Sequence, residues 1–405
     1  MDCASSDIYS FEAGPIRPPS EGQARSLLIR ATRNCPWNRC QFCRTYKGTR
    51  FEYRAPAEVK RDIAVARLLA DKLSEASLRL GCPGQINNDV LRAVVRSHPD
   101  VYGGDPGRGV VQARLHSLMN VAEWLGSGAG TAFLQDADSL VMRTGELVEV
   151  IRCLKETFPG INRVTSYARS KTTALKQLEE LQALREVGLS RLHVGLESGC
   201  DEVLAFMDKG VTYDEHVMGG RKVVEAGISL SEYVMPGLGG RAWSDLHARR
   251  TAEALNHIGP EYIRVRSLII RAGTLLWDRV AAGEFVLPGE DEVIEEIGLF
   301  IENLNCRAYI VSDQMSNLLM EIEGRLPEDK QALLAVIARY RAMQPSERLT
   351  FRLDRRLRSY LGVYGQLEPA LSGQVEAAVD SLNREAPDAA ARVEQAIAAL
   401  KAKFV

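Results

Sequence analysis

Three cysteines stand close together near the start of the chain and offer three ligands of one chemical kind. Cys35, Cys40 and Cys43 follow the apolar run 26–32, which predicts a buried strand. Thiolates are soft ligands that suit an iron–sulfur cluster or zinc better than a hard cation. No Cys or His lies between Cys43 and Cys82 to act as a local fourth ligand. Because structural zinc normally takes four ligands, the pattern favours a cluster with one open iron. The alternatives are zinc with a distant fourth ligand and three buried thiols.

The spacing of these cysteines resembles that of a known family. Four residues separate Cys35 from Cys40, and Phe42 directly precedes Cys43. A loop of this kind after a first strand resembles the radical S-adenosylmethionine (SAM) superfamily, whose commonest spacing has three residues between the first two cysteines. The run Cys-Pro-Trp-Asn-Arg-Cys-x-Phe-Cys is similar to an uncharacterised subgroup near the oxygen-independent coproporphyrinogen oxidase and methylthiotransferase branch. The resemblance covers about residues 17–290.

The resemblance implies an oxygen-sensitive enzyme with one 4Fe–4S cluster on the three cysteines and SAM on the fourth iron. Reductive cleavage of SAM would give a 5′-deoxyadenosyl radical that abstracts hydrogen from a small-molecule or cofactor-like organic substrate. The electron donor would be a protein such as flavodoxin or ferredoxin. Two alternatives remain open, a methyl or methylthio transferase and a non-catalytic chaperone that carries a cluster or haem on the same fold. No motif identifies a catalytic residue or the substrate.

Composition narrows the class of protein. The chain has 405 residues, with 45% hydrophobic and 26% charged residues, which excludes wholesale disorder. The formal net charge of −2 gives no global attraction for nucleic acid or an anionic membrane, so neither is expected as a partner. No apolar stretch could span a bilayer and the first residues lack a signal-peptide pattern, so we expect a cytoplasmic protein. The five cysteines outside the loop are isolated in sequence, and we expect no second cluster.

Short apolar runs alternate with amphipathic helical segments between residues 25 and 290, which predicts an α/β fold with a parallel sheet. We expect a partial (β/α)6 TIM-like barrel at 25–290, an extended lead-in at 1–24 and a helical C-terminal domain at 291–405. An insertion at 74–130 is either a lid or a plain surface excursion. Strands are expected at 26–32, 131–134, 163–167, 191–196, 229–235 and 262–270. Helices are expected at 57–73, 89–97, 113–125, 144–157, 171–187, 213–226, 244–258, 292–303, 312–323, 328–343 and, with a break near Pro387, 371–403.

Polar residues at the ends of the predicted strands are the candidate ligands of SAM, because ligands gather at the carboxyl ends of parallel strands. Glu197 is the strongest of them, since an isolated buried carboxylate needs a polar partner. Asp138 has a second interpretation as a helix N-cap, and Phe42 has one as simple loop packing. The full set of predicted cofactor contacts is Phe42, Gln135, Asp136, Asp138, Ser166, Arg169, Glu197, Ser198, Met235 and Gly237.

Two groups of basic residues have open roles. Arg264, Arg266 and Arg271 lie on or just beyond the sixth strand and could hold a substrate carboxylate or form structural ion pairs. A dense basic run at 348–360 is interpreted either as a solvated helix face or as a contact for an anionic substrate or partner.

Overall fold

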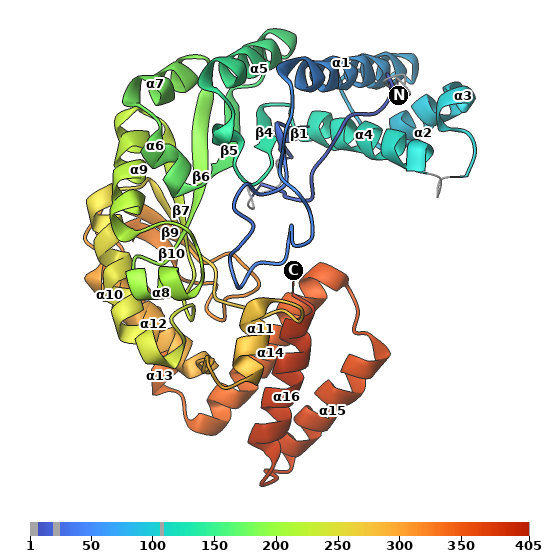
Figure 1. Ribbon diagram of the computed structural model, residues 1–405. Coiled ribbons are helices and arrows are strands. Elements are labelled where there is room, and N and C mark those ends of the chain that lie inside the picture. Colours follow the sequence, from blue (N-terminus) through green and yellow to red (C-terminus); the bar gives the residue numbers. More distant parts are fainter. Residues whose placement is uncertain (1–6, 19–24, 106–108, 405) are drawn as a thin grey trace. The chain divides into compact units, whose positions relative to one another are not determined.

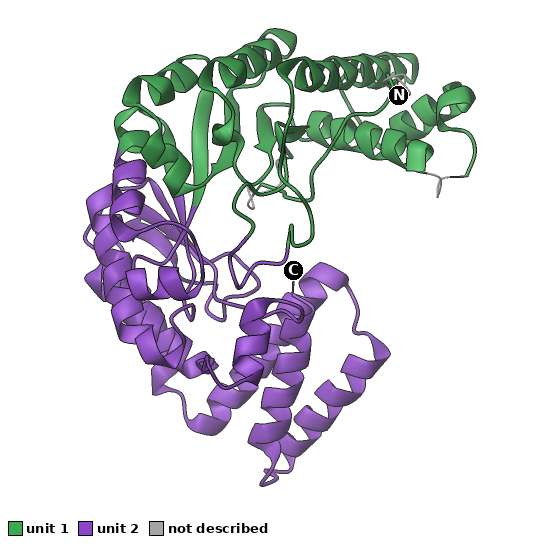
Figure 2. Ribbon diagram, viewed as in Figure 1, with its two compact units in different colours: residues 1–38, 45–194, 222–230 green, residues 39–44, 195–221, 231–405 purple. Residues whose placement is uncertain are grey.

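The structure is a computed structural model that describes residues 7–18, 25–105 and 109–404. The chain forms two compact units (Figure 2). Unit 1 comprises Met1–Asn38, Thr45–Val194 and Lys222–Leu230, and unit 2 comprises Arg39–Arg44, Gly195–Arg221 and Ser231–Val405. The division runs through the cysteine loop and through the predicted core, while the predicted domain boundaries at 24 and 290 stay predictions.

Eight strands of the described residues form one sheet in the order β1, β4, β5, β6, β7, β8, β9, β10 (Figure 1). They are β1 (Leu27–Arg30), β4 (Thr131–Gln135), β5 (Arg163–Ala168), β6 (Leu189–Glu197), β7 (Ser229–Val234), β8 (Tyr262–Val265), β9 (Ala308–Val311) and β10 (Glu323–Leu326). The pairs from β1 to β6 and from β7 to β9 are parallel, and β10 is antiparallel to β9. The prediction of an α/β fold with a mostly parallel sheet is confirmed, and its closure into a partial (β/α)6 barrel stays a prediction.

Helices follow most of the strands (Figure 1). In unit 1 they are α1 (Pro56–Arg79), α2 (Asn88–Ser97), α3 (Pro99–Tyr102), α4 (Gly109–Gly126), η1 (Ser139–Val141), α5 (Thr144–Thr157), α6 (Ser170–Leu175) and α7 (Leu178–Glu186). α9 (Tyr213–Glu225) falls in both units. In unit 2 they are α8 (Asp201–Phe206), α10 (Gly240–Ile258), α11 (Leu275–Ala281), α12 (Glu290–Asn303), α13 (Lys330–Ala342), α14 (Pro345–Tyr364), α15 (Pro369–Asn383) and α16 (Ala389–Ala402).

Three expectations for these elements are wrong. The predicted helix 171–187 is two helices, because Lys176 is extended and its ammonium group donates to Thr144 at 2.8 Å. Strands do not stop after residue 290, since β9 and β10 follow. The predicted helix 312–323 consists of turns and the start of β10. There the Arg356 guanidinium donates to three successive backbone carbonyls, those of Met315, Ser316 and Asn317, which a helix would need for its own hydrogen bonds.

The basic run 348–360 lies on α14, and both interpretations of it are wrong for its central arginines. Arg356 is buried and pairs with the carboxylate of Glu290 at 2.6 Å. Arg352 pairs with Glu394 at 2.8 Å. These contacts belong to the interior of unit 2, so the run joins α14 to α12 and α16.

The segments around unit 1 are held by side-chain hydrogen bonds. Residues 7–18 have neither helix nor strand, and the backbone N–H of Phe11 donates to the Ser117 hydroxyl on α4 at 3.0 Å. α4 packs against α1 and β1.

The lid role of the insertion 74–130 stays a hypothesis. Among the described residues, we find no helix with both the length and the apolar character that crossing a membrane requires.

Candidate cofactor site

The cysteine loop begins and ends in a short antiparallel clip. β2 (Thr32–Arg33) pairs with β3 (Glu52–Tyr53), so the ends of the loop between them are held together in unit 1. Asn34 and Asn38 flank Cys35 with φ of 68° and 49°. Asparagine is one of the few residues with a side chain that enters this left-handed region readily. The Asn38 amide also donates to the carbonyl of Tyr46 at 2.6 Å, which fixes the turn around Cys35.

The three cysteines are half-buried and form no disulfide among the described residues. In unit 1 the backbone N–H of Asn38 donates to Sγ of Cys35 at 3.4 Å, the kind of hydrogen bond that stabilises a ligating thiolate. In unit 2 the N–H of Cys43 donates to the carbonyl of Cys40 at 3.3 Å. No three His, Cys, Asp or Glu side chains of the described residues already form a metal-binding group. The donor set suits a cluster with three thiolate ligands, and that assignment stays a prediction.

The middle of the loop is anchored in unit 2. The N–H of Gln41 donates to the carbonyl of Met207 at 2.9 Å, and its own carbonyl accepts from Leu276 at 3.1 Å. Phe42 packs against the apolar cluster around Met207 and Leu276. The ammonium group of Lys209 lies 5.8 Å from the Phe42 ring centroid. Phe42 therefore packs in the loop as its second interpretation has it, and its contact with adenine stays a prediction.

Two predicted ligands at the end of β4 already contact the chain itself. The Gln135 amide accepts from the N–H of Gly14 at 2.9 Å and donates back to its carbonyl at 3.1 Å. Asp136 is fully buried, and its Oδ2 lies 2.6 Å from an Nη of Arg30 and 3.0 Å from the N–H of Asn34. Burial raises the pKa of Asp136, and the hydrogen bond from Arg30 opposes the rise.

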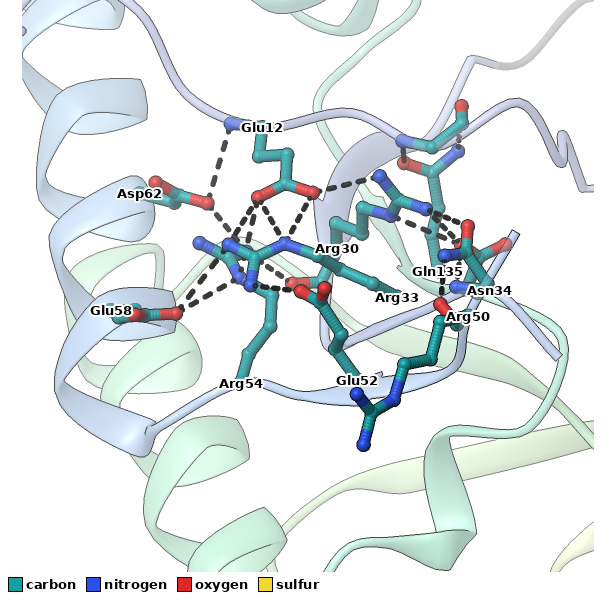
Figure 3. Close-up of polar contacts among 12 residues, drawn as sticks. Glu12, Arg30, Arg33, Asn34, Arg50, Glu52, Arg54, Glu58, Asp62 and Gln135 are labelled. Atoms are coloured by element: carbon teal, nitrogen blue, oxygen red, sulfur yellow. Dashed lines mark hydrogen bonds and ion pairs between the residues drawn. The ribbon is translucent and has the colours of Figure 1, made fainter. Parts of the chain in front are cut away.

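These contacts continue into a network of ion pairs in unit 1 (Figure 3). Glu12 lies at its centre and accepts from Arg30 at 2.7 Å and from Arg33 at 2.8 Å. Arg54 is almost fully buried and donates to Asp62 at 2.8 Å and to the carbonyl of Arg30. Burial would raise the pKa of Glu12, but the arginines outweigh it and lower the pKa. The network holds the lead-in against the start of the cysteine loop.

The other predicted residues of unit 1 are also engaged within it. Asp138 is fully buried and accepts from the Thr172 hydroxyl at 2.5 Å, and burial raises its pKa to about 6. It does not cap η1 through its side chain. The buried Ser166 hydroxyl donates to the carbonyl of Leu134 at 3.0 Å. The Arg169 guanidinium lies over the ring of Trp37, 5.1 Å from the ring centroid. Trp37 is in the cysteine loop, two positions after Cys35.

Glu197 ends β6 in a conformation that few residues with a side chain adopt, with φ of 63°. Its carboxylate lies 3.4 Å from the Lys209 ammonium group. A Cβ on Gly195 would lie 2.4 Å from the Glu197 carboxylate and 3.2 Å from the Lys209 nitrogen. Glycine at 195 therefore leaves the space in which this acid–base pair meets.

The residues after Glu197 pack the turn against α10. The buried hydroxyl of Ser198 accepts from the N–H of Cys200 at 3.0 Å. The N–H of Gly199 donates to the Thr251 hydroxyl at 3.0 Å. A Cβ on Gly199 would lie 2.4 Å from the carbonyl oxygen of Arg250, so α10 approaches as closely as glycine allows. Ser198 thus has a structural contact, and its contact with SAM stays a prediction.

The site residue that sequence reasoning missed is Glu232 on β7. It is 1% exposed, and neither carboxylate oxygen has a hydrogen-bond partner within the described part of the chain by distance and angle. Burial, and after it the charge of Glu197, raises its pKa well above the ordinary value. A buried carboxyl without a partner is costly and points to a ligand. The sequence could have indicated this residue, because Glu232 is a charged residue inside the predicted buried strand 229–235.

Met235 and Gly237 form the turn between β7 and α10. The N–H of Met235 donates to the carbonyl of Glu197 at 3.0 Å. Gly237 has φ of 86°, which favours glycine, and its N–H donates to the Glu296 carboxylate at 2.7 Å. The structure thus joins three predicted contacts, Glu197, Met235 and Gly237, in one part of unit 2.

The arginines on and after β8 divide into two kinds. Arg264 lies 3.4 Å from the carboxylate of Asp313, as a structural arginine would. Arg266 and Arg44 make no ion pair or hydrogen bond through their side chains with any part of the chain that the structure describes. Arg271 donates to the carbonyl of Phe404 at 2.7 Å; burial lowers its pKa, as do the charges of Arg44 and Arg266. Three guanidinium groups therefore lie near one another and near Cys43, and none of them pairs with a carboxylate of the described residues.

Known proteins share parts of this chain. The tRNA uridine(34) acetyltransferase of Methanocaldococcus jannaschii is 22% identical over 121 residues, which are 29% of this chain and 22% of that protein. The matched segment therefore spans about a fifth of that relative.

Solved structures match only loosely. Coproporphyrinogen III oxidase of Escherichia coli has a TM-score of 0.41 at 14% identity and covers 71% of this chain and 54% of its own. The archaeal Elp3 of Methanocaldococcus infernus has a TM-score of 0.37 at 16% identity and covers 47% of this chain and 48% of its own.

A family model gives the clearer result. Residues 111–250, which run from α4 through most of α10, match the Radical SAM superfamily. The match begins after the cysteine loop, so the loop and the matched region are independent indications of the same family. Members of that superfamily work with a 4Fe–4S cluster and SAM, for which three thiolates are suitable ligands. Residues 111–250 of this chain are therefore similar to the Radical SAM superfamily.

Proposed function

We propose that the protein is a radical SAM enzyme that abstracts hydrogen from an organic substrate. The observation that carries the proposal is the loop with Cys35, Cys40 and Cys43, which offers three thiolates and no local fourth ligand. When bound there, the cluster and SAM supply reductive cleavage of the sulfonium and a carbon-centred radical. The protein contributes position and shielding.

The chain's own residues would bind the polar end of SAM in unit 2. The Glu197 carboxylate accepts hydrogen bonds from hydroxyl or ammonium groups, and the Lys209 ammonium group lies 3.4 Å from it. Burial raises the pKa of Glu232, which favours the neutral carboxyl group that can donate a hydrogen bond as well as accept one. Such a group near the Glu197 carboxylate suits a ligand with adjacent hydroxyl groups, as on a ribose.

Three arginines near Cys43 support a substrate with an anionic group. Arg44 and Arg266 lack carboxylate partners among the described residues, and their charges lower the pKa of Arg271. Guanidinium groups bind carboxylates and phosphates with two parallel hydrogen bonds. Carboxylate- and phosphate-bearing compounds are therefore the first substrates to test.

The test is anaerobic reconstitution of the full chain followed by a screen for substrate-dependent 5′-deoxyadenosine. The screen compares anionic metabolites with their neutral esters or amides, and a Cys40→Ala variant is the control for uncatalysed cleavage. We expect formation of 5′-deoxyadenosine with the wild-type chain only. Full cluster content without any cleavage of SAM would instead favour the cluster- or haem-carrying chaperone.

Transfer of a methyl or methylthio group is the second enzymatic candidate and leaves a different product. S-adenosylhomocysteine in the same reactions would identify it. The relatives named as tRNA uridine(34) acetyltransferases give a reason to include bulk tRNA as one arm of the screen. The prediction against a nucleic-acid partner fails if tRNA stimulates cleavage of SAM.

A further inference from the structure

A buried histidine–glutamate pair lies behind the two turns that carry Glu197 and Gly237. His247 is on α10 and Glu296 is on α12, both in unit 2. Their side chains are 3% and 2% exposed, and Nδ1 of His247 lies 3.0 Å from Oε1 of Glu296. Both residues lie on helices, whereas the predicted ligands of SAM lie at the ends of strands.

The Glu296 carboxylate accepts from three donors. They are His247, the hydroxyl of Ser244 and, at 2.7 Å, the backbone N–H of Gly237. The two carboxyl oxygens of Glu296 thus take part in three hydrogen bonds, two of them with residues of α10. One buried side chain of α12 thereby fixes both the start of α10 and the glycine turn after β7.

The second ring nitrogen of His247 reaches the Glu197 turn. Its Nε2 lies 3.3 Å from the backbone carbonyl oxygen of Glu197, which also accepts from the N–H of Met235. A backbone carbonyl can only accept, so Nε2 of His247 is the donor to Glu197. The carbonyl of a residue with φ of 63° is thus held by two donors.

Packing alone gives no reason for a buried hydrogen-bonded pair at this place. Two apolar side chains of similar volume would fill the space between α10 and α12 without the cost of removing polar groups from water. The pair does what apolar groups could not, since it hydrogen-bonds a backbone atom in each of two turns. Both turns carry residues predicted to contact SAM.

We propose that His247 and Glu296 are positioning residues for the cofactor. They hold the Glu197 turn and the Gly237 turn in the geometry that receives SAM, without touching SAM themselves. The proposal rests on the proposed function, in which Glu197 binds the polar end of SAM.

The test uses the full chain reconstituted anaerobically, with His247→Ala and His247→Gln as variants. Iron content, SAM affinity by calorimetry and the electron paramagnetic resonance spectrum of the reduced cluster with SAM are measured. We expect unchanged iron and about 10- to 100-fold weaker SAM binding for His247→Ala, as for one or two hydrogen bonds to a charged group. The amide of His247→Gln can replace one of the two hydrogen bonds and should recover part of the affinity.

His257→Ala is the matched control. His257 is exposed near the end of the same helix and contacts the Tyr213 hydroxyl at 2.7 Å. Its removal should change neither SAM affinity nor the spectrum. Wild-type affinity and spectrum in both His247 variants would overturn the proposal.

A double variant separates this proposal from the one on which it rests. If His247 acts through Glu197, adding His247→Ala to Glu197→Gln should weaken binding by less than about 3-fold further. Fully multiplicative losses would overturn the positioning role. If Glu197→Gln alone binds SAM normally, the proposed role of Glu197 fails. If Glu197→Gln weakens binding and the His247 variants do not, only the positioning proposal fails.

Discussion

The end of β4 in unit 1 and the ends of β6 and β7 in unit 2 carry acidic side chains that the chain uses differently. At β4, Asp136 has one oxygen engaged by the Arg30 guanidinium and the N–H of Asn34. At β7, neither oxygen of Glu232 has a hydrogen-bond partner within the described residues, and Glu197 faces Lys209 at 3.4 Å. The same residue type at the same kind of position pairs with an arginine in unit 1 and has weaker contacts in unit 2. We therefore expect the acids of unit 2 to be the ones that bind the cofactor.

The pKa values of Asp136 and Glu232 are affected differently because the two carboxyl groups have different neighbours. Burial raises the pKa of Asp136, but Arg30 limits the rise. Burial and the nearby charge of Glu197 raise the pKa of Glu232 well above its usual range. The charge of Lys209 opposes this rise but does not outweigh burial.

The roles of these acids depend on a bound cofactor. Removing a cluster ligand should therefore have the largest effect on cluster content and on cleavage of SAM. Cys40→Ala should lose the cluster absorbance and all cleavage of SAM after reconstitution. Cys82→Ala, which removes an isolated half-buried thiol, should keep the ~4 irons of one cluster. Full iron and sulfide content in Cys40→Ala would contradict the assignment, and about eight irons in the wild type would contradict the prediction of a single cluster.

A carboxyl with strong partners should be the next most sensitive. Glu290 is buried between Arg356 at 2.6 Å and Lys401 at 2.7 Å. Glu290→Gln leaves the buried Arg356 without its charge partner and should cost about 3–5 kcal/mol in the free energy of unfolding. Chemical denaturation monitored by tryptophan fluorescence measures the loss. A change under about 1 kcal/mol would show that the three backbone carbonyls suffice for Arg356.

The same carboxyl predicts an acid limb of stability. Burial would raise the pKa of Glu290, but the charges of Lys401 and Arg356 outweigh it and bring it from 4.5 to about 2. Because the folded-state pKa is lowered, this stabilisation is present above pH 4.5 and is lost as the pH falls towards 2. Unfolding free energies at a series of pH values should fall over that window less steeply for Glu290→Gln than for the wild type.

Matched amide substitutions at the two strand ends test the comparison directly. Glu197→Gln should weaken SAM binding by about 1.5–3 kcal/mol, the range for a hydrogen bond to a charged group, with the cluster intact. Asp136→Asn should leave SAM affinity unchanged and lower stability instead. The SAM affinity of both reconstituted variants is measured by calorimetry. Normal affinity in Glu197→Gln together with weak binding in Asp136→Asn would reverse the assignment of the two ends.

The smallest expected effect concerns the stability of Glu232. Burial raises its pKa, and neither of its carboxyl oxygens meets a hydrogen-bond partner at good distance and angle among the described residues, so Glu232→Gln should change the free energy of unfolding by less than about 1 kcal/mol. SAM affinity should fall in the same variant. A loss of stability as large as that of Glu290→Gln would mean that the chain does supply a partner for Glu232.

The sequence identifies most of the elements, because apolar runs and helical periodicity depend on neighbouring residues alone. The predicted limits of α5 are those observed, and the break before α16 falls near Pro387 as predicted. β10 (Glu323–Leu326) could not be found in this way. Its charged sequence has no strand propensity, and its register comes from pairing with β9.

The candidate site shows the same limit. Glu197 is recognisable because an acid and a serine end an apolar run. The partners of Asp136 and Gln135 could not be foreseen, since Arg30 and Gly14 lie more than 100 residues earlier in the chain. His247 looks like any polar residue of an amphipathic helix until Glu296 and the Glu197 carbonyl are placed beside it.

The two glycines that flank the Glu197 turn should have different evolutionary histories. A side chain at 195 would occupy the space of the Glu197 carboxylate, whereas one at 199 would collide with the backbone of α10. Position 199 is therefore constrained by the architecture and position 195 by the chemistry. In a lineage that kept the fold and lost the reaction, we expect drift at 195 once Glu197 is gone, with glycine retained at 199. The residue at 195 would then tell active homologues from decayed ones in a set of sequences.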